Sequence, residues 1–232
     1  MSAEIHRCLI LDTETSGLED SAPVIEIGAV LYSVDNQCSL QEMSTLIPAA
    51  GNEAEPINRI KAAALDEVSL TRSVSFAMEL LFAMSKSADV FVAHNADFDS
   101  KRLFGNTDFL SLASLPWLCT MSDFKWPLAT REQGSLINIA LDHGIGVASA
   151  HRALTDCRLI AALFDRMADL PAMFQIAMRP KALFVGLQPF EDNQLAKDAG
   201  FKWDRLVPKR WSRMMAIEDA ESLSFPVRQV SQ

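Results

Sequence analysis

The 232-residue sequence contains no uninterrupted apolar run near the roughly 18 residues that a membrane span needs. Its four cysteines lie far apart and form no C-x-x-C pair, which argues against a zinc site and favours reduced thiols. The first residues show no basic segment followed by an apolar run and a cleavage site, so we expect no secretion signal. Internal repeats are also absent. Together with a hydrophobic content of 49%, these absences predict a cytoplasmic globular protein that does not enter a membrane.

Positive charge is scarce along most of the chain. The net charge is −9, and residues 1–178 carry 12 lysines and arginines against 23 acidic residues. Residues 179–213 reverse this balance, with 8 basic against 4 acidic residues. Because phosphate binding depends largely on lysine and arginine, the acidic body predicts weak nonspecific binding to duplex nucleic acid. The basic segment is where contact with a nucleic-acid backbone is expected.

Hydrophobic periodicity predicts an α/β fold. Three strands come first and form a meander, after which helices and strands alternate, so we expect a mixed sheet flanked by helices. The predicted strands are residues 8–14, 24–34, 40–47, 89–95 and 115–120, and the predicted helices are residues 58–65, 73–87, 99–104, 134–144 and 151–170.

Pro171 is expected to stop the last of these helices, and the domain boundary is expected within residues 171–180. Residues 1–172 then form one domain. Residues 173–232 form a small basic α+β module, with a strand, a helix, two short strands and an acidic tail.

An acidic pair ends the first strand, in the stretch CLILDTETSGL. Residues two apart on a strand share a face, so Asp12 and Glu14 point the same way and Thr13 points away. Two oxygen ligands on one rigid face suit a hard cation such as Mg²⁺ or Mn²⁺. The alternative is an ordinary strand end that runs into a polar turn.

A second polar cluster, HNADFD, follows the fourth strand and opens a helix, a common position for site residues in α/β proteins. Asn95 or Asp97 is suited to cap this helix, which is the structural alternative to a site. Asp99 remains as a further carboxylate in the first turn, where the helix dipole tolerates negative charge.

The third cluster is HRALTDC. Five helical positions separate His151 from Asp156, a rotation of about 140°, so the two converge only if His151 precedes the helix. The alternative makes both of them solvated surface residues. The apolar neighbours of Asp156 on the helix argue against that alternative.

The blocks DTETSGL, AHNADFD and HRALTD, in this order, resemble the three motifs of the DEDDh family of 3′→5′ exonucleases. This is the DnaQ-like group with an RNase-H-like core, and the stretches WLCTM (residues 117–121) and HRALTDC are most similar to the exonuclease X branch. The resemblance implies four carboxylate ligands for two metal ions, Mg²⁺ or Mn²⁺, and a histidine as general base. By position, the ligands are Asp12, Glu14, Asp99 and Asp156, and the base is His151.

Other residues are weaker candidates for the base. Tyr32 is the one tyrosine in the sequence and lies on the second strand, so a tyrosine-type site is not expected. His94 suits a buried hydrogen-bonded role, and His143 is placed at a helix end. A two-metal site can hold the attacking and leaving oxygens of a phosphodiester hydrolysis, so we expect strict dependence on divalent metal.

The resemblance also implies a grip on the 3′-terminal nucleotide by the residues that follow the first block, with Leu18 as a wedge beside the terminal base. Trp203 and Trp211 stand among cations in the basic module, a combination that suits stacking and charge contacts with a single strand. The alternatives are that these tryptophans pack the module's own core, or that the module docks a protein partner. The predicted substrate-binding residues are Thr13, Thr15, Gly17, Leu18, Asn95, Trp203, Lys209, Arg210 and Trp211.

The sequence thus predicts an exonuclease that releases nucleoside monophosphates from single-stranded 3′ ends, with DNA favoured over RNA, in a process such as DNA repair. Three alternatives stay open: an exoribonuclease, a nucleic-acid-binding protein on an inactive exonuclease fold, and a proofreading subunit that acts with a polymerase. The five residues of the expected site are all present, which argues against an inactive fold.

Overall fold

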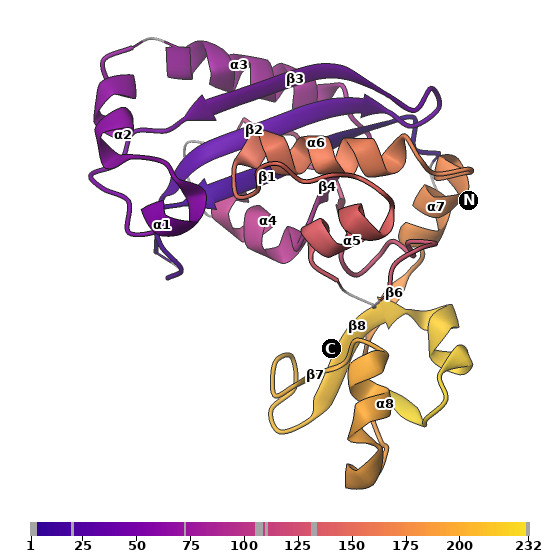
Figure 1. Ribbon diagram of the computed structural model, residues 1–232. Coiled ribbons are helices and arrows are strands. Elements are labelled where there is room, and N and C mark those ends of the chain that lie inside the picture. Colours follow the sequence, from indigo (N-terminus) through magenta and orange to yellow (C-terminus); the bar gives the residue numbers. More distant parts are fainter. Residues whose placement is uncertain are drawn as a thin grey trace.

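The computed structural model describes residues 4–19, 21–71, 73–104, 109, 111–130 and 134–230. Its large domain is built on a five-stranded mixed sheet with strand order β3-β2-β1-β4-β5 (Figure 1). The first three strands form the predicted antiparallel meander, and β4 and β5 run parallel to β1. The strands are β1 (Arg7–Thr15), β2 (Val24–Ser33), β3 (Cys38–Leu46), β4 (Val90–Ala93) and β5 (Trp117–Cys119).

Seven helices in the described residues belong to this domain, and they confirm the α/β class. They are α1 (Glu55–Asn58), α2 (Ala62–Val68), α3 (Ser73–Lys86), α4 (Ala96–Phe104), α5 (Leu136–Asp142), α6 (Ala153–Phe164) and α7 (Leu170–Ala177). None of the helices in the described part of the chain combines the length and the apolar character that crossing a membrane requires.

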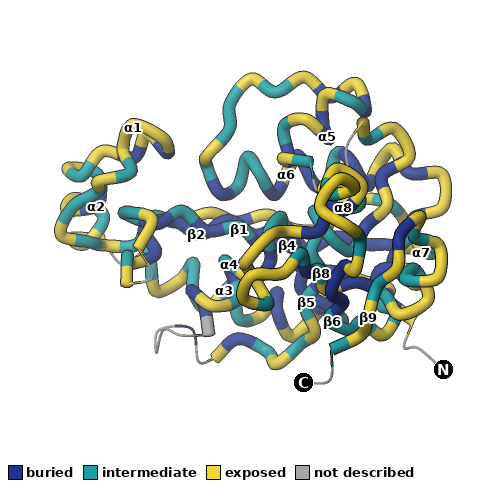
Figure 2. Tube along the Cα trace, turned by 90° about the horizontal axis from the view of Figure 1, so that it is seen from below, coloured by how far each residue is buried: buried dark blue, intermediate teal, exposed yellow. Residues whose placement is uncertain are grey.

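The alternation of β1 explains how the sheet is covered on both faces. Cys8 and Ile10 belong to a core shared with α5, α6 and α7, whereas Leu9 and Leu11 belong to a second core shared with α3. Successive strand residues point to opposite faces, so each face receives every second side chain. Figure 2 shows buried residues concentrated in the central strands β1, β2 and β4, whereas helices such as α2 and α8 (Asn193–Asp198) are more exposed.

Two predicted helices are interrupted. The helix expected over 58–65 is replaced by α1 and α2, because Arg59 adopts a left-handed conformation with φ of 59° between them. The helix expected over 151–170 ends at Phe164. Pro171 lies in the first turn of α7, where proline is favoured, and the side chain of Asp169 caps that helix by accepting from the Ala172 N–H.

The helix α7 spans the boundary that was expected between residues 172 and 173. Its buried residues Leu170, Phe174 and Ala177 pack in the core of the large domain. We therefore place the division of the chain after this helix, near Pro180, at the C-terminal end of the segment expected to contain the boundary.

The C-terminal module has its own antiparallel sheet, in the order β7-β8-β6-β9, and its own small core around Phe184 and Phe201. It lies on the side of the large domain away from β3 (Figure 1), and it borders a pocket that Trp117 and Cys119 of β5 also line. An ion pair between Lys181 and Asp123 joins it to the large domain. Its elements are β6 (Lys181–Gly186), α8 (Asn193–Asp198), β7 (Lys202–Trp203), β8 (Trp211–Ala216) and β9 (Val227–Val230).

Candidate active site

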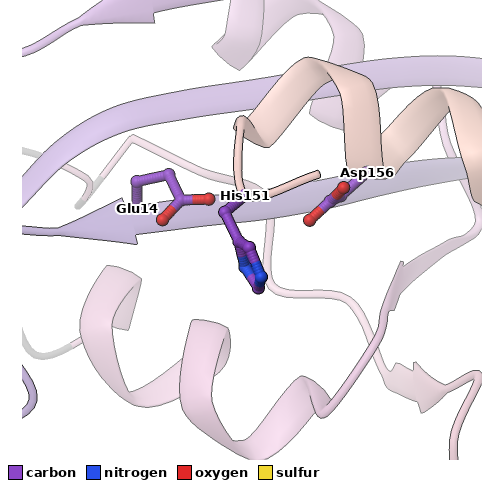
Figure 3. A group of neighbouring side chains, drawn as sticks. All are labelled: Glu14, His151 and Asp156. Atoms are coloured by element: carbon purple, nitrogen blue, oxygen red, sulfur yellow. The ribbon is translucent and has the colours of Figure 1, made fainter. Parts of the chain in front are cut away.

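The end of β1 carries two half-buried carboxylates on the face that α6 covers. Asp12 and Glu14 continue the series of Cys8 and Ile10, whose side chains pack in the core beneath α6. Figure 3 shows Glu14 pointing toward the start of α6. The strand alternation that predicted a shared face for this pair therefore also directs the pair to the helix that carries the third motif.

His151 lies in the loop before α6, as the spacing to Asp156 required. Its backbone has a left-handed conformation, with φ of 61°. Ligand atoms of Glu14, His151 and Asp156 all lie within 4.8 Å of one another (Figure 3). The structure thus brings together residues of the first and third motifs, and His151 stays exposed to solvent within that group.

Two residues of β2 hold the start of α6 in place. Glu26 is buried and accepts two hydrogen bonds from Arg152, at 2.7 and 3.0 Å, and one from the Ala153 N–H at 3.1 Å. Two residues further along the strand, a Cβ on Gly28 would lie 2.3 Å from the Leu154 nitrogen, so only glycine permits this approach of strand and helix. These contacts fix the backbone on the C-terminal side of His151.

Asp99 reaches β1 from α4, at the residue between Asp12 and Glu14. One of its carboxylate oxygens, Oδ1, accepts from both the Thr13 N–H at 2.9 Å and the Thr13 hydroxyl at 2.7 Å. The carboxyl of Asp99 is only 2% exposed. Thr13, predicted to contact substrate, has its hydroxyl engaged by Asp99.

Mutual repulsion and burial disfavour ionisation of the carboxylates. Burial, followed by the charges of Asp156, Glu26 and Asp99, raises the pKa of Glu14 to about 8. Burial raises the pKa of Asp99 to about 7, although the hydrogen bonds from Thr13 favour its charged form. The pKa of Asp12 is well above its ordinary value, because it is buried beside Asp99, Asp156 and Glu14.

This set of carboxylates fits divalent metal ions. Burial raises the pKa of Asp156, and its Oδ1 atom is buried without a hydrogen-bond partner in the described structure. An oxygen in that condition costs free energy unless a cation or a donor reaches it. Hard oxygen donors are the ligands that Mg²⁺ and Mn²⁺ prefer. Glu14 and Asp156, whose ligand atoms lie within 4.8 Å of each other, could therefore hold a metal ion. Asp12 and Asp99 are not in that group, but the charge of Asp99 acts on both Asp12 and Glu14, so they are further candidates for ligands.

The other histidines considered for the base have structural partners. The Nδ1 atom of His94 lies 2.9 Å from the Thr120 hydroxyl, and burial lowers the pKa of His94 to about 4. His143 is buried at the end of α5, where its ring contacts the carbonyl of Ile139. Tyr32 is buried and donates to Asp165 at 2.6 Å.

The residues predicted to grip a terminal nucleotide line the turn after β1 and the start of α4. Thr15 is buried and donates to the Gly17 carbonyl at 2.7 Å, which holds the turn closed. Leu18 follows as a largely exposed side chain, 84% accessible. Asn95 precedes α4 with φ of 69°. These placements leave Leu18 free to contact a ligand.

The four predicted residues of the C-terminal module lie around one pocket, which Phe190 and Gln188 also line. Trp203 is exposed, whereas Trp211 packs against the module's core, and the two rings lie 5.8 Å apart. Lys209 and Arg210 border the same pocket. Trp211 therefore packs the module's own core, as the alternative interpretation expected, whereas Trp203 is accessible to a ligand.

Sequence reasoning missed Glu26, Arg152 and the link between Thr13 and Asp99. A signal for Glu26 was present, because a single acidic residue interrupts the apolar stretch VIEIGAV of a buried strand. A buried carboxylate of this kind requires a partner. Nothing near it in the sequence identifies Arg152 as that partner.

The two parts of the chain match two different family models. Residues 9–164 match the family model described as Exonuclease (RNase_T). Residues 182–230 match a domain of unknown function (DUF8626). The chain is 32% identical over 164 residues to the DNA polymerase III subunit epsilon of Treponema pallidum (strain Nichols), covering 67% of this chain and 74% of that protein.

Solved structures show the same fold as the large domain. Exonuclease X in complex with 5′ overhanging duplex DNA is similar with a TM-score of 0.50 and 26% identity, over 73% of this chain and 99% of that one. The nuclease domain of 3'hExo, a DEDDh family member bound to rAMP, is similar with a TM-score of 0.54 at 15% identity, over 72% and 94% of the two chains. They confirm the RNase-H-like sheet and helices expected from the sequence.

Proposed function

Because this chain belongs to the DEDDh family of 3′→5′ exonucleases, we propose that it removes nucleoside monophosphates one at a time from the 3′ ends of single-stranded DNA. The observation that carries the proposal is the convergence of Glu14, His151 and Asp156, with ligand atoms within 4.8 Å of one another. This group combines a solvent-accessible imidazole with carboxylates, as metal-assisted hydrolysis requires.

The family depends on divalent metal, and we propose two ions held by Asp12, Glu14, Asp99 and Asp156. When bound, the ions supply positive charge to the phosphate and to the attacking and leaving oxygens. Four ionised carboxylates carry as much negative charge as two divalent ions carry positive charge. The raised pKa values of Glu14 and Asp99 support this assignment, because the site favours full ionisation only when that charge is neutralised.

His151 is the proposed general base. Its ring is exposed beside Glu14 and Asp156, so a ring nitrogen can accept a proton from an attacking water. Glu26 and Arg152 position the loop that carries it. Thr15, Gly17 and Leu18 are proposed to hold the terminal nucleotide, with Leu18 against its base, and Asn95 to contact the nucleotide from the start of α4.

A second candidate function is that of a proofreading subunit acting with a polymerase. The similarity to the polymerase III subunit epsilon of T. pallidum supports it. The same catalytic residues would serve both roles, so the two candidates differ in whether the isolated chain is fully active.

Digestion of matched 5′-labelled DNA and RNA single strands tests the proposal. We expect a ladder that shortens from the 3′ end of the DNA strand with Mg²⁺, and no product with EDTA or with Asp12→Asn. Asp66→Asn is the matched control, because Asp66 is an exposed aspartate on α2 and does not belong to the group of Glu14, His151 and Asp156. Faster digestion of RNA would overturn the choice of DNA. Activity that requires an added polymerase would favour the second candidate.

A further inference from the structure

A groove between the two parts of the chain carries a charge opposite to that of the protein. It has a volume of about 280 Å³, and its lining includes four cationic side chains against the two acidic side chains of Asp97 and Asp123. The whole chain, in contrast, has a net charge of −9. The four cations are Lys181, Lys202, Arg205 and Arg213.

Two of these cations are available to a ligand. Lys181 forms an ion pair with Asp123, and the Nη1 atom of Arg213 donates to the Ala199 carbonyl, so both have partners within the protein. Lys202 and Arg205 are exposed, and neither forms an ion pair within the described residues. Exposed cations that the fold does not neutralise, in an acidic protein, indicate an anionic ligand.

The groove is next to the candidate active site. Its wall on the large domain includes Asn95, Ala96 and Asp97, at the start of the helix that carries Asp99 two residues later. Trp117 and Cys119 of β5, the edge strand of the large sheet, continue this wall. A chain of phosphates that left the active site past the start of α4 would therefore meet Lys202 and Arg205.

The groove also has apolar surface. Leu206 and Met214 line it with exposed side chains, 49% and 37% accessible. A duplex presents its phosphates outward and keeps its bases stacked inside, whereas a single strand offers base faces to apolar side chains as well as phosphates to cations. This combination favours a single strand over a duplex.

We infer that this groove binds the backbone phosphates of a single-stranded nucleic acid, several nucleotides upstream of the 3′ end that the active site cleaves. Lys202 and Arg205 supply the phosphate contacts, and Leu206 and Met214 contact the bases. The inference rests on the proposed function and assigns to the C-terminal module the capture of substrate. It concerns a different pocket from the one beside Trp203 and Trp211, because Lys202 and Trp203 are successive residues of β7 and point to opposite faces of the module's sheet.

Binding without cleavage tests the inference. Fluorescence anisotropy of a labelled oligo(dT) of about 12 nucleotides, within the reach of such a surface, is measured in EDTA over a series of salt concentrations. The variants are Lys202→Ala with Arg205→Ala, and the matched double variant Lys86→Ala with Arg228→Ala. The control pair changes the net charge equally at exposed positions, one on α3 and one on β9.

We expect the Lys202 and Arg205 variant to bind less tightly and to reduce the slope of log K against log salt by about 1.4, since each single-strand phosphate contact contributes about 0.7. The loss should shrink as the strand is shortened to a few nucleotides. An unchanged slope, or an equal loss in the control pair, would overturn the inference. An equal loss on a blunt duplex would overturn the assignment to single strands.

The same preparations separate this inference from the proposed function. If the wild-type chain binds the strand through Lys202 and Arg205 but produces no ladder with Mg²⁺, the proposed nuclease function is wrong, and the assignment of the groove to strand binding is supported. If the wild-type chain digests the strand, and the Lys202→Ala, Arg205→Ala variant has the same affinity and salt slope as the control pair, the proposed nuclease function is supported. The groove then does not bind the strand, and the inference is wrong.

Discussion

The hydroxyl and the backbone N–H of Thr13 both donate to the same carboxylate oxygen of Asp99, at 2.7 and 2.9 Å. The second motif is thereby attached to the first through the residue of β1 that points away from Asp12 and Glu14. Hydrogen bonds to a carboxylate favour its charged form, so Thr13 should make Asp99 a better ligand for the proposed metal ions.

Thr13→Val should therefore weaken metal binding while preserving the shape of the side chain. The pKa of Asp99, about 7 with both hydrogen bonds, rises when the hydroxyl is lost. We expect the half-saturating Mg²⁺ concentration to increase by about 10- to 100-fold, the usual cost of losing a partner of a metal ligand. The increase should be larger near pH 7 than near pH 9, where Asp99 is ionised in both proteins.

Thr45→Val is the matched control, because Thr45 is also a buried strand threonine but its hydroxyl donates to the neighbouring Leu46 carbonyl and not to a carboxylate. Magnesium titrations of activity at the two pH values compare the variants. An unchanged magnesium requirement for Thr13→Val would contradict the role of Thr13.

Arg152→Ala tests whether the pairing with Glu26 positions His151. The substitution removes two of the hydrogen bonds to a buried carboxylate, so we expect a loss of stability of about 1–3 kcal/mol. The loop before α6 then shifts, and a misplacement of about 1 Å at a reacting group costs about 100-fold in rate. We expect a fall in kcat of that order.

Arg158→Ala is the control for Arg152→Ala, since Arg158 pairs with Glu42 on the surface and such pairs contribute at most about 1 kcal/mol. Thermal unfolding and steady-state kinetics measured on the same samples separate the two effects. The positioning role is excluded if the loss of activity of Arg152→Ala is accounted for by its unfolded fraction alone.

Metal and pH should act together on stability. Glu14 has an ordinary pKa of 4.5 and a pKa of about 8 in the folded, metal-free protein, so between these values the folded state binds more protons than the unfolded state. The free energy of unfolding therefore falls as the pH rises through this range, and Asp99 contributes the same sign up to about pH 7. In EDTA, we expect Tm to decrease from about pH 6 to about pH 8.5, and the stabilisation by Mg²⁺ to grow over the same range.

Glu14→Gln removes one titrating group and should raise the metal-free Tm at the alkaline end while abolishing activity. Glu79→Gln, at an exposed position of α3, should change neither. A metal-free Tm that rises with pH would contradict the assigned direction of the pKa shifts.

The positions of the expected site residues followed from local rules. Strand alternation put Asp12 and Glu14 on one face, and the rotation per helical residue required His151 to precede α6. Both rules involve only residues that are close in sequence. The pairing of Glu26 with Arg152 joins residues from opposite ends of the domain, and no local pattern selects it.

The break after α6 was hidden for a related reason. Ile160, Phe164, Met167 and Leu170 are all buried in one core, so the apolar periodicity continues through the turn that separates α6 from α7. Hydrophobic spacing reports which residues face the core and does not report whether the helix is continuous. The strand β9 was missed because four residues that pair with β6 carry no stronger signal than a tail.

His151→Asn separates the chemistry of the imidazole from its backbone. His151 has φ of 61°, a conformation that asparagine tolerates better than most residues, so the variant keeps the loop before α6. If the ring accepts the proton of the attacking water, kcat should fall by about 10²- to 10⁴-fold with KM and Tm nearly unchanged. His6→Asn is the control, since His6 is exposed and pairs with Asp35 away from the site.

Single-turnover cleavage of a 5′-labelled strand with saturating Mg²⁺ measures the chemical step directly. Added imidazole should restore part of the activity of His151→Asn, because it can enter the space that the ring leaves and accept the same proton. A variant that cleaves at the rate of the wild type would show that the proton leaves the water by another route, and His151 would then lose its assignment while the metal ligands kept theirs.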